Sequence, residues 1–411
     1  MSEKSIARIF DHQSMKLNNQ LTILRQIRDR GPITRVDLRE RTRLSWGTIT
    51  STIKELLGRS VIKEIGSITT SVGRRPIELD MNTERNFVLG LQLGGGFVRS
   101  SLVDVKGKVA EELDALVNPR GSRQEILNCL ISTGKRILKK HSVEPSDLVG
   151  IGIATPGPVD FRAGFCLYAP LHPKWKNVPL KKIFEQKFGV PCFVDHDCNC
   201  FALSEKLFGF GRDLEDFLCV LLGEGVSAGI VINGEVYRGS ECFSGEFGHT
   251  CIEMNGPECA CGNTGCLETY ISGSALARIA AEEVRQRPES RILAIAGGNA
   301  EKITAETLCL AAQQGDALAA NLFKRMGVYL GVGVANLINL FNPARVILVG
   351  RLTIAYRFFL PTFFETLEKR AWHASTRDVS ISGLERGAVM GAAALVLQEA
   401  FTSGLIMRRK A

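Results

Sequence analysis

The stretch from Gly245 to Glu268 contains residue types that bind metals. It reads GEFGHTCIEMNGPECACGNTGCLE, and three of its cysteines follow a C-x-C-x4-C spacing. With one histidine they offer an imidazole and three thiolates, from His249, Cys259, Cys261 and Cys266. Four such ligands fit a closed, tetrahedral, structural zinc site. We therefore predict a structural Zn²⁺ here; the alternative is a loop that carries three free thiols.

Two carboxylates flank this loop. Glu246 precedes the histidine, and Glu268 follows the last cysteine of the spacing. Carboxylates in a loop ordered by a metal can accept hydrogen bonds from sugar hydroxyls. The alternative is that both are solvated surface acids, and these two residues alone do not decide between the two interpretations.

Charge is distributed unevenly along the 411 residues. The net charge is +8, and residues 1–80 contribute +6 of it, from 15 Lys and Arg against 9 Asp and Glu. A basic segment on a nearly neutral body favours contact with nucleic acid. The start of the chain lacks the apolar run of a secretory signal, and no stretch is apolar enough to span a membrane. We expect a cytoplasmic protein with no membrane insertion.

The basic segment has the pattern of a winged helix-turn-helix. Apolar residues at helical spacing end at Gly31-Pro32, a short helix covers 35–41, and a third helix begins after Ser45. Two β-like runs, 61–65 and 77–79, then bracket a loop. We predict contacts with double-stranded operator DNA from Ser45, Trp46, Thr48, Thr50, Ser51 and Lys54 in the third helix, and from Arg74 and Arg75 in the loop. The alternative is a generic three-helix bundle with a solvated loop.

The remainder of the chain has the pattern of a two-lobed α/β body. The predicted domains are 1–80 for DNA binding, 85–195 for the first lobe, and 196–411 for the second lobe with the zinc loop, dimerisation and the C-terminal helices. The predicted strands are 87–93, 97–104, 109–113, 149–154, 192–194, 217–222, 229–232 and 345–349. The predicted helices are 123–140, 180–188, 274–286, 304–314, 316–341 and roughly 386–400.

Several motifs resemble those of one family. The cysteine loop, from E-F-G-H at 246–249 through C-x-C-G-x-x-G-C-x-E at 259–268, resembles the signature of the ROK family of repressors, open reading frames and sugar kinases. TPGPVD at 155–160, DHDCN at 195–199 and NLFNP at 339–343 are similar to further family motifs. The resemblance implies an actin-like, hexokinase-like (ribonuclease H-like) ATPase-fold body. The basic segment resembles the winged helix-turn-helix of the family's repressors, such as those for N-acetylglucosamine and xylose.

The resemblance also implies roles for individual residues. Asp197 matches the base that the family's kinases use to take a proton from the sugar hydroxyl. Glu246, His249 and Glu268 match further sugar contacts, with His249 shared with zinc, and Asn177 is a weaker match.

Four residues depart from the kinase pattern on the ATP side: Gln92, Gly96, Glu224 and Arg351. Gln92 stands where kinases carry an acid that helps organise Mg²⁺, and Glu224 would repel a triphosphate. Loss of the ATP motifs with retention of the sugar motifs predicts a non-enzymatic, sugar-responsive repressor that binds a sugar or sugar phosphate as a homodimer or homotetramer. The alternatives are an ATP-dependent sugar kinase with an added DNA-binding domain, and a regulator whose effector is a sugar-transport protein.

Overall fold

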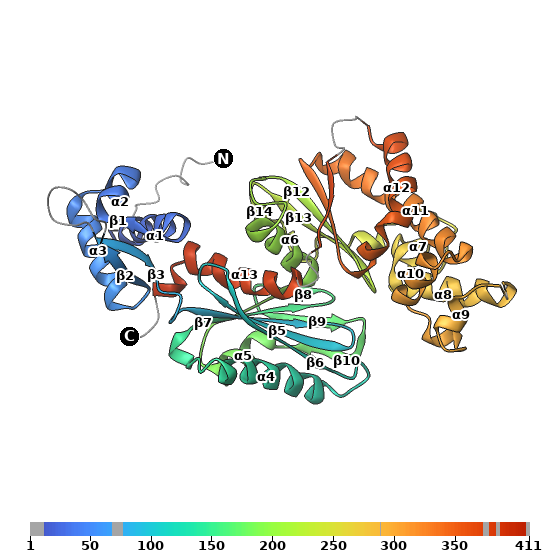
Figure 1. Ribbon diagram of the computed structural model, residues 1–411, viewed down its shortest axis with the longest axis horizontal. Helices are drawn as coiled ribbons and strands as arrows, with labels where there is room; N and C mark the ends of the chain where they lie inside the picture. The colour runs from blue at the N-terminus through green and yellow to red at the C-terminus, as the bar shows by residue number, and fades with distance from the viewer. Residues whose placement is uncertain (1–11, 68–76, 288, 373–377, 384–386, 408–411) are drawn as a thin grey trace, which may run out of the picture. The chain divides into compact units, whose positions relative to one another are not determined.

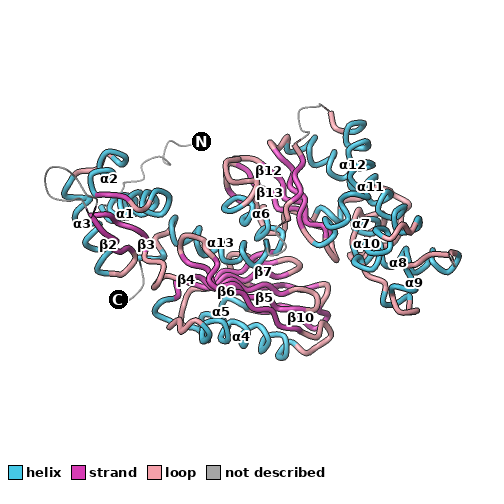
Figure 2. Tube along the Cα trace, viewed as in Figure 1, coloured by secondary structure: helices cyan, strands magenta, loops and turns pink. Residues whose placement is uncertain are grey.

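The chain folds as two compact units. The computed structural model describes residues 12–67, 77–287, 289–372, 378–383 and 387–407 (Figure 1). The first unit contains the described parts of 1–156, 161–195 and 392–411, and the second contains those of 157–160 and 196–391. Figure 2 shows the helices in cyan and the strands in magenta, and each unit contains elements of both kinds.

The N-terminal part of the first unit contains three helices and a small antiparallel sheet. Its elements are α1 (His12–Arg30), β1 (Ile33–Thr34), α2 (Arg35–Thr42), α3 (Trp46–Gly58), β2 (Ile62–Ser67) and β3 (Ile77–Met81). Thr34 forms a capping box with Asp37 at the start of α2, and the Ser45 hydroxyl caps α3 by accepting from the Thr48 amide. The predicted order of three helices followed by two strands is confirmed, and β1 is an additional strand that was not predicted. Arg74 and Arg75 lie outside the described residues.

A five-stranded sheet forms the centre of the first unit. Its strand order is β11-β7-β4-β5-β6, with β4 parallel to β7 and the β4-β5-β6 strands antiparallel. The strands are β4 (Phe87–Leu93), β5 (Phe97–Asp104), β6 (Val109–Leu116), β7 (Leu148–Thr155) and β11 (Cys192–His196). Helices α4 (Arg123–Lys140) and α5 (Leu180–Phe188) lie beside one face of this sheet in Figure 1, and η1 (Pro145–Asp147) precedes β7.

The C-terminal helix covers part of the same sheet. A side chain at Gly152 in β7 would collide with the backbone of Ala392 in α13 (Gly387–Thr402), so glycine permits this close approach. The sequence-based division placed residues 196–411 in one lobe, whereas residues 392–411 group with the first unit. The helix itself was predicted; its partner is decided by packing between residues far apart in the sequence.

The hairpin of β9 (Phe165–Ala169) and β10 (His172–Val178) was not predicted. Its register shifts between His172 and Lys176, and two prolines flank the turn region at 170 and 173. A shifted register and prolines weaken the alternation by which strands are recognised. Nε2 of buried His172 donates to the Gly94 carbonyl oxygen over 2.8 Å, which connects this hairpin to the turn after β4.

The second unit repeats the sheet topology of the first. Its strand order is β14-β13-β12-β15-β16, with β12 parallel to β15 and antiparallel to β13. Numbered by order of appearance, the strands of both sheets run 3-2-1-4-5. The strands are β12 (Phe217–Leu222), β13 (Val226–Ile232), β14 (Glu235–Val236), β15 (Arg345–Val349) and β16 (Val379–Ile381), and β8 (Val159–Asp160) also groups with this unit.

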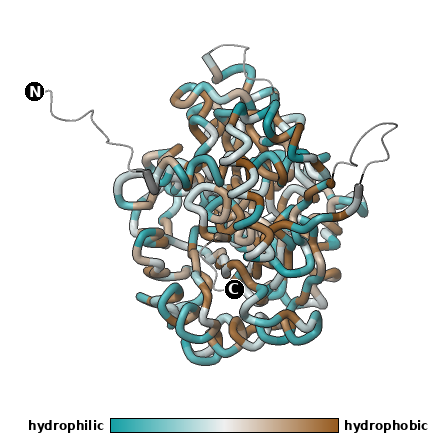
Figure 3. Tube along the Cα trace, turned by 90° about the vertical axis from the view of Figure 1, so that its left-hand side faces the viewer, coloured by the Kyte–Doolittle hydropathy of each residue, from teal (hydrophilic) through white to brown (hydrophobic). Residues whose placement is uncertain are grey.

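Helices supply most of the core of the second unit. They are α6 (Asp197–Phe208), η2 (Phe247–His249), α7 (Glu268–Ile271), α8 (Gly273–Glu283), η3 (Val284–Gln286), α9 (Ile292–Ile295), η4 (Ala300–Lys302), α10 (Ala305–Gln313), α11 (Ala317–Phe341), η5 (Arg351–Ala355) and α12 (Tyr356–Arg370); η6 (Leu405–Met407) follows α13. Brown, hydrophobic runs alternate with teal ones along the trace in Figure 3.

Two helices of this unit were missed for identifiable reasons. Residues Cys198–Glu205 of α6 are all buried, so the helix has no polar face to reveal its period. Helix α12 contains Pro361 in its interior, which normally ends a helix. It nevertheless packs along α11, where Gly327 and Gly331 admit the backbone of Phe359 and Phe363.

Candidate metal centre and neighbouring carboxylates

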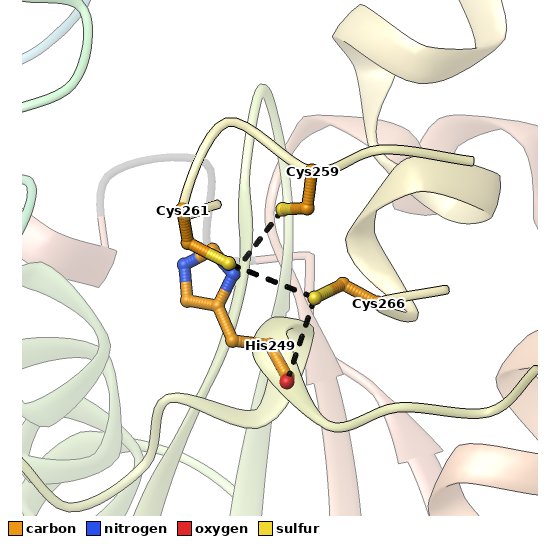
Figure 4. Close-up of side chains that lie close together, drawn as sticks. All are labelled: His249, Cys259, Cys261 and Cys266. Atoms are coloured by element: carbon orange, nitrogen blue, oxygen red, sulfur yellow. Dashed lines mark hydrogen bonds between the residues drawn. The ribbon is translucent and has the colours of Figure 1, made fainter. Parts of the chain in front are cut away.

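The four predicted metal ligands lie together. The ligand atoms of His249, Cys259, Cys261 and Cys266 are all within 4.8 Å of one another (Figure 4). His249 ends the short helix η2, and the cysteines belong to the loop that leads to α7. Gly245 begins this segment with a φ of 88°, and a side chain there would strike the Ala228 carbonyl oxygen of β13.

The distances within this cluster fit a tetrahedral ion with mixed ligands. The sulfurs of Cys261 and Cys266 are 3.7 Å apart, and Nδ1 of His249 is 3.6 Å from the Cys259 sulfur. With bonds of about 2.3 Å to sulfur and 2.0–2.1 Å to nitrogen, a tetrahedral zinc ion separates two sulfurs by about 3.8 Å, and a sulfur from a nitrogen by about 3.5 Å. The residues can therefore hold a metal of this kind.

Glu246 lies next to His249, the histidine of the candidate metal cluster. Nδ1 of His249 faces the cysteines, and its Nε2 is 4.0 Å from a Glu246 carboxylate oxygen. A metal-bound histidine commonly directs its second nitrogen to a carboxylate, which fixes the orientation of the ring. Glu246 can thus orient His249 and still present its other oxygen to a ligand.

Asp197 is the first residue of α6, directly after β11. Burial raises the pKa of its carboxyl group, Glu246 adds to that rise, and the neighbouring His196 opposes it. Nε2 of His196 is 3.3 Å from the Asp197 carboxylate, and its Nδ1 is 3.0 Å from the Cys198 sulfur. The 3.0 Å separation is shorter than the spacing of about 3.5 Å expected around zinc, so these three residues form a hydrogen-bonded group.

Glu268, a predicted effector contact, also forms a hydrogen bond to the backbone of the second unit. One of its carboxylate oxygens accepts from the Val226 amide over 2.9 Å. This bond holds α7 against the turn at 223–225, because Val226 directly follows that turn. The bonded oxygen is Oε2, and Oε1 is the atom left for a ligand.

The second unit contains Asp197, Glu246, His249 and Glu268, whereas Asn177 belongs to the first. Asn177 is exposed in β10 and has a left-handed backbone, with a φ of 49°. The structure therefore brings four of the five predicted effector ligands into one compact unit.

The residues that depart from the kinase pattern have partners of their own. The Glu224 carboxylate accepts from the Ser274 hydroxyl over 2.9 Å, at the N-terminal turn of α8. Arg351 forms an ion pair with Glu306 at 2.9 Å. In the first unit Gln92 is buried, and its side-chain oxygen has no hydrogen-bond partner among the described residues. Ser274 was missed by the sequence analysis, since a lone serine carries no signal.

The predicted DNA-contacting face of α3 is largely exposed. Ile49, Ile53 and Leu56 of α3 are buried, and the exposed residues are Ser45, Trp46, Thr50, Ser51 and Lys54, with Thr48 half-buried. The Arg39 guanidinium lies 5.0 Å from the centre of the Trp46 ring and fixes that ring by a cation–π contact.

Comparison with known proteins identifies the family. The ROK family model matches residues 88–399. The xylose repressor of Caldicellulosiruptor bescii is 32% identical over 392 residues, covering 95% of this chain and 98% of that protein. The DNA-binding transcriptional dual regulator NagC of Escherichia coli is 31% identical over 405 residues, covering 98% and 97%. The chain belongs to the ROK family, as its motifs predicted.

Solved structures show the same architecture. A ROK family transcriptional regulator, a homologue of the E. coli MLC protein, superposes with a TM-score of 0.82 at 29% identity, covering 96% of this chain and 98% of that one. A ROK family glucokinase from Streptomyces griseus in complex with glucose and AMPPNP gives 0.68 at 29% identity, covering 75% and 99%. The kinase structure thus matches about three-quarters of the chain, whereas the regulator structure matches nearly all of it. No helix among the described residues is long and apolar enough to cross a membrane.

Proposed function

We propose that this protein is a sugar-responsive transcriptional repressor that binds operator DNA through residues 1–80 and a sugar or sugar phosphate through its kinase-like body. The observation that carries the proposal is how much of the chain the known regulators match. The xylose repressor and the regulator structure match nearly the whole chain, including the basic segment, whereas the family model begins only at residue 88.

The DNA-binding surface in this proposal is the exposed face of α3. Small polar side chains at Thr50 and Ser51 read base edges in the major groove, and Lys54 contacts the phosphate backbone. Arg74 and Arg75 extend the contact to a neighbouring groove or phosphate. Two copies of the chain in a homodimer, or four in a tetramer, bind the half-sites of a palindromic operator.

The effector site in this proposal is built on Asp197, Glu246, His249 and Glu268 of the second unit, and Asn177 of the first unit stays a predicted effector contact. Carboxylates and an imidazole accept and donate hydrogen bonds in the pattern that sugar hydroxyls require. A structural Zn²⁺ held by His249 and the three cysteines orders this wall of the site. With four protein ligands, a bound Zn²⁺ would fix the His249 ring and would have no open position for chemistry.

The hydrogen bonds around the turn at 223–225, which corresponds to a phosphate loop in the family's kinases, support binding of the effector without phosphoryl transfer. Glu224 lies in the turn at 223–225 and its carboxylate accepts from Ser274, while the Glu268 carboxylate accepts from the Val226 amide that follows the turn. Like charges disfavour a triphosphate there. The effector then acts by preferring one arrangement of the two units, and coupling of about 1–3 kcal/mol between effector and DNA suffices for regulation.

Two assays on the full-length protein test the proposal. Selection from a random duplex pool should enrich an inverted repeat, and titration with pentoses, hexoses, amino sugars and their phosphates should change affinity for that repeat. Asp197→Asn should abolish the response while leaving DNA affinity unchanged, and exposed Asp213→Asn serves as the matched control.

A coupled ADP-release assay separates the repressor from the kinase alternative. We expect no sugar-dependent turnover with ATP and Mg²⁺. Turnover of about 1 s⁻¹, an ordinary enzyme rate, contradicts the non-enzymatic proposal. If no free sugar changes DNA affinity but a purified sugar-transport component does, the effector is a protein and the sugar part of the proposal is wrong.

A further inference from the structure

An exposed cysteine lies opposite one of the metal ligands. Cys251 and Cys266 are partners in an isolated antiparallel bridge. Cys251 is exposed and Cys266 is buried. Cys251 is not one of the four clustered ligands within the described part of the chain, so it is an additional thiol beside the metal centre.

The backbone hydrogen bonds define what kind of pair this is. The Ile252 amide donates to the Gly265 carbonyl oxygen over 2.9 Å, and the Leu267 amide donates to the Thr250 carbonyl oxygen over 3.0 Å. These bonds flank the two cysteines and do not join them, so the cysteines occupy a non-hydrogen-bonded position. At such positions the Cα atoms are about 4.5 Å apart and the Cβ atoms about 4.5–5.5 Å apart.

The neighbouring residues show which face the two thiols share. Leu267 belongs to the hydrophobic core, and Ile252 packs against that core. In a directly opposed pair both side chains leave the backbone on the same side, so Cys251 is on the side of the bridge from which Cys266 joins the candidate ligand cluster. A disulfide needs Cα atoms about 4.4–6.8 Å apart and Cβ atoms about 3.5–4.5 Å apart. The Cα spacing typical of such a pair meets the first requirement, and the second requires the Cβ atoms to approach by up to about 1 Å.

We propose that Cys251 and Cys266 form an oxidant-sensitive pair in which a hydroperoxide closes a Cys251–Cys266 disulfide and releases the zinc ion. The proposal rests on the zinc site proposed above and adds an oxidant as a second input. Cys251 is the thiol that meets the oxidant because it is exposed and not bound to the metal. Cys266 is the thiol that resolves the reaction because it lies directly opposite.

The chemistry balances in two steps. The Cys251 sulfur attacks hydrogen peroxide, an S–O bond forms, the O–O bond breaks, and one water leaves, giving a sulfenic acid. The Cys266 thiolate then leaves the metal and attacks that sulfur; an S–S bond forms, the S–O bond breaks, and the hydroxide takes a proton from solvent. One thiol and one thiolate are oxidised, one peroxide is reduced to two waters with a proton from solvent, and a bound Zn²⁺ would be left with three protein ligands and would dissociate more readily. A dithiol reductant reverses the disulfide and permits zinc to rebind.

The test uses full-length, zinc-loaded protein treated with one equivalent of hydrogen peroxide beside a chromogenic zinc chelator. Wild type should release zinc and yield a Cys251–Cys266 cross-linked peptide in non-reducing mass spectrometry. Cys251→Ser should release zinc at least about tenfold more slowly and lack that peptide, because its hydroxyl cannot form a sulfenic acid. Cys242→Ser, which removes a half-buried thiol of the same unit, should behave as wild type.

Equal zinc release from wild type and Cys251→Ser overturns the proposal. The proposal is also overturned if the only disulfides formed are between members of the set Cys259, Cys261 and Cys266. Zinc content is measured before treatment: protein that never held zinc contradicts the zinc site instead, and the cross-linked peptide alone then decides whether the two thiols form a pair.

Discussion

His249 has two ring nitrogens, and the structure gives each a different neighbour. Nδ1 faces the Cys259 sulfur, and Nε2 faces the Glu246 carboxylate. His249 can therefore bind the metal through Nδ1 while its Nε2 interacts with Glu246, a proposed effector contact. Loss of the metal should disturb both the loop and the sugar response, because one side chain serves both.

Cys261→Ala tests this dependence. We expect the variant to lose zinc, to unfold at a lower temperature, and to lose the sugar response. The physical reason is that a closed site with three remaining ligands binds zinc weakly and the glycine-rich loop has little apolar packing of its own. Metal analysis, thermal unfolding and sugar-dependent DNA binding measure the three effects.

Cys242→Ala is the control for Cys261→Ala. It removes a thiol from the same unit outside the cluster, and it should retain zinc. A Cys261→Ala protein that lacks zinc but responds fully to sugar contradicts the proposed link between metal and effector site.

At the scale of elements, helix ends position the functional groups. Asp197 is the first residue of α6, so the first turn of that helix fixes its backbone. The longest helix, α11, begins at the Asp316 cap, and it supplies much of the core beneath the metal loop. Stability of the second unit should therefore depend on that cap.

Asp316→Ala should lower the free energy of unfolding by about 1–2 kcal/mol at neutral pH, as loss of an N-cap does. The Asp316 carboxylate accepts from the Ala319 amide, the Ser290 hydroxyl and the Arg291 amide, at 2.9, 2.8 and 2.6 Å. Denaturant unfolding followed by circular dichroism measures the change. Asp213→Ala, at an exposed position, should leave stability unchanged.

The hydrogen bonds of Asp316 also predict how the free energy of unfolding depends on pH. Burial raises the pKa of Asp316, but its hydrogen bonds outweigh burial and hold that pKa below its usual value. Its contribution is therefore complete above the unfolded-state pKa, about 3.9, and is lost as pH falls through the lower folded-state pKa. Wild type should lose more stability than Asp316→Ala as pH is lowered below about 4. Parallel acid-unfolding curves for the two proteins contradict the assignment.

At the scale of the whole molecule, the sheet topology defines the body, whereas most of the net charge lies in the N-terminal segment. Two sheets with the same 3-2-1-4-5 order form the body, which the kinase and regulator structures share. Residues 1–80 lie entirely before the family match and carry +6 of the net +8. Binding of a polyanion at this segment should then depend strongly on salt.

Arg74→Ala should weaken DNA binding about equally on all sequences and reduce the slope of log affinity against log salt by about 1, as loss of a phosphate contact does. Fluorescence anisotropy with the selected duplex and a scrambled duplex, over a range of salt, measures both effects. Lys139→Ala removes an exposed cation from α4 in the body and is the charge-matched control. Thr50→Ala should instead change sequence preference, and an unchanged preference contradicts base readout by α3.

The sequence by itself determined the metal cluster, the family and most helices and strands. Cysteine spacing is a local signal, and capping residues such as Thr34 and Ser45 act within one turn, so each can be recognised without the fold. Only the tertiary structure showed that α13 packs on the first sheet, that Ser274 holds Glu224, and that Cys251 lies opposite Cys266. Each of these depends on contacts between segments that no local pattern connects, because burial and register are set by the folded chain as a whole.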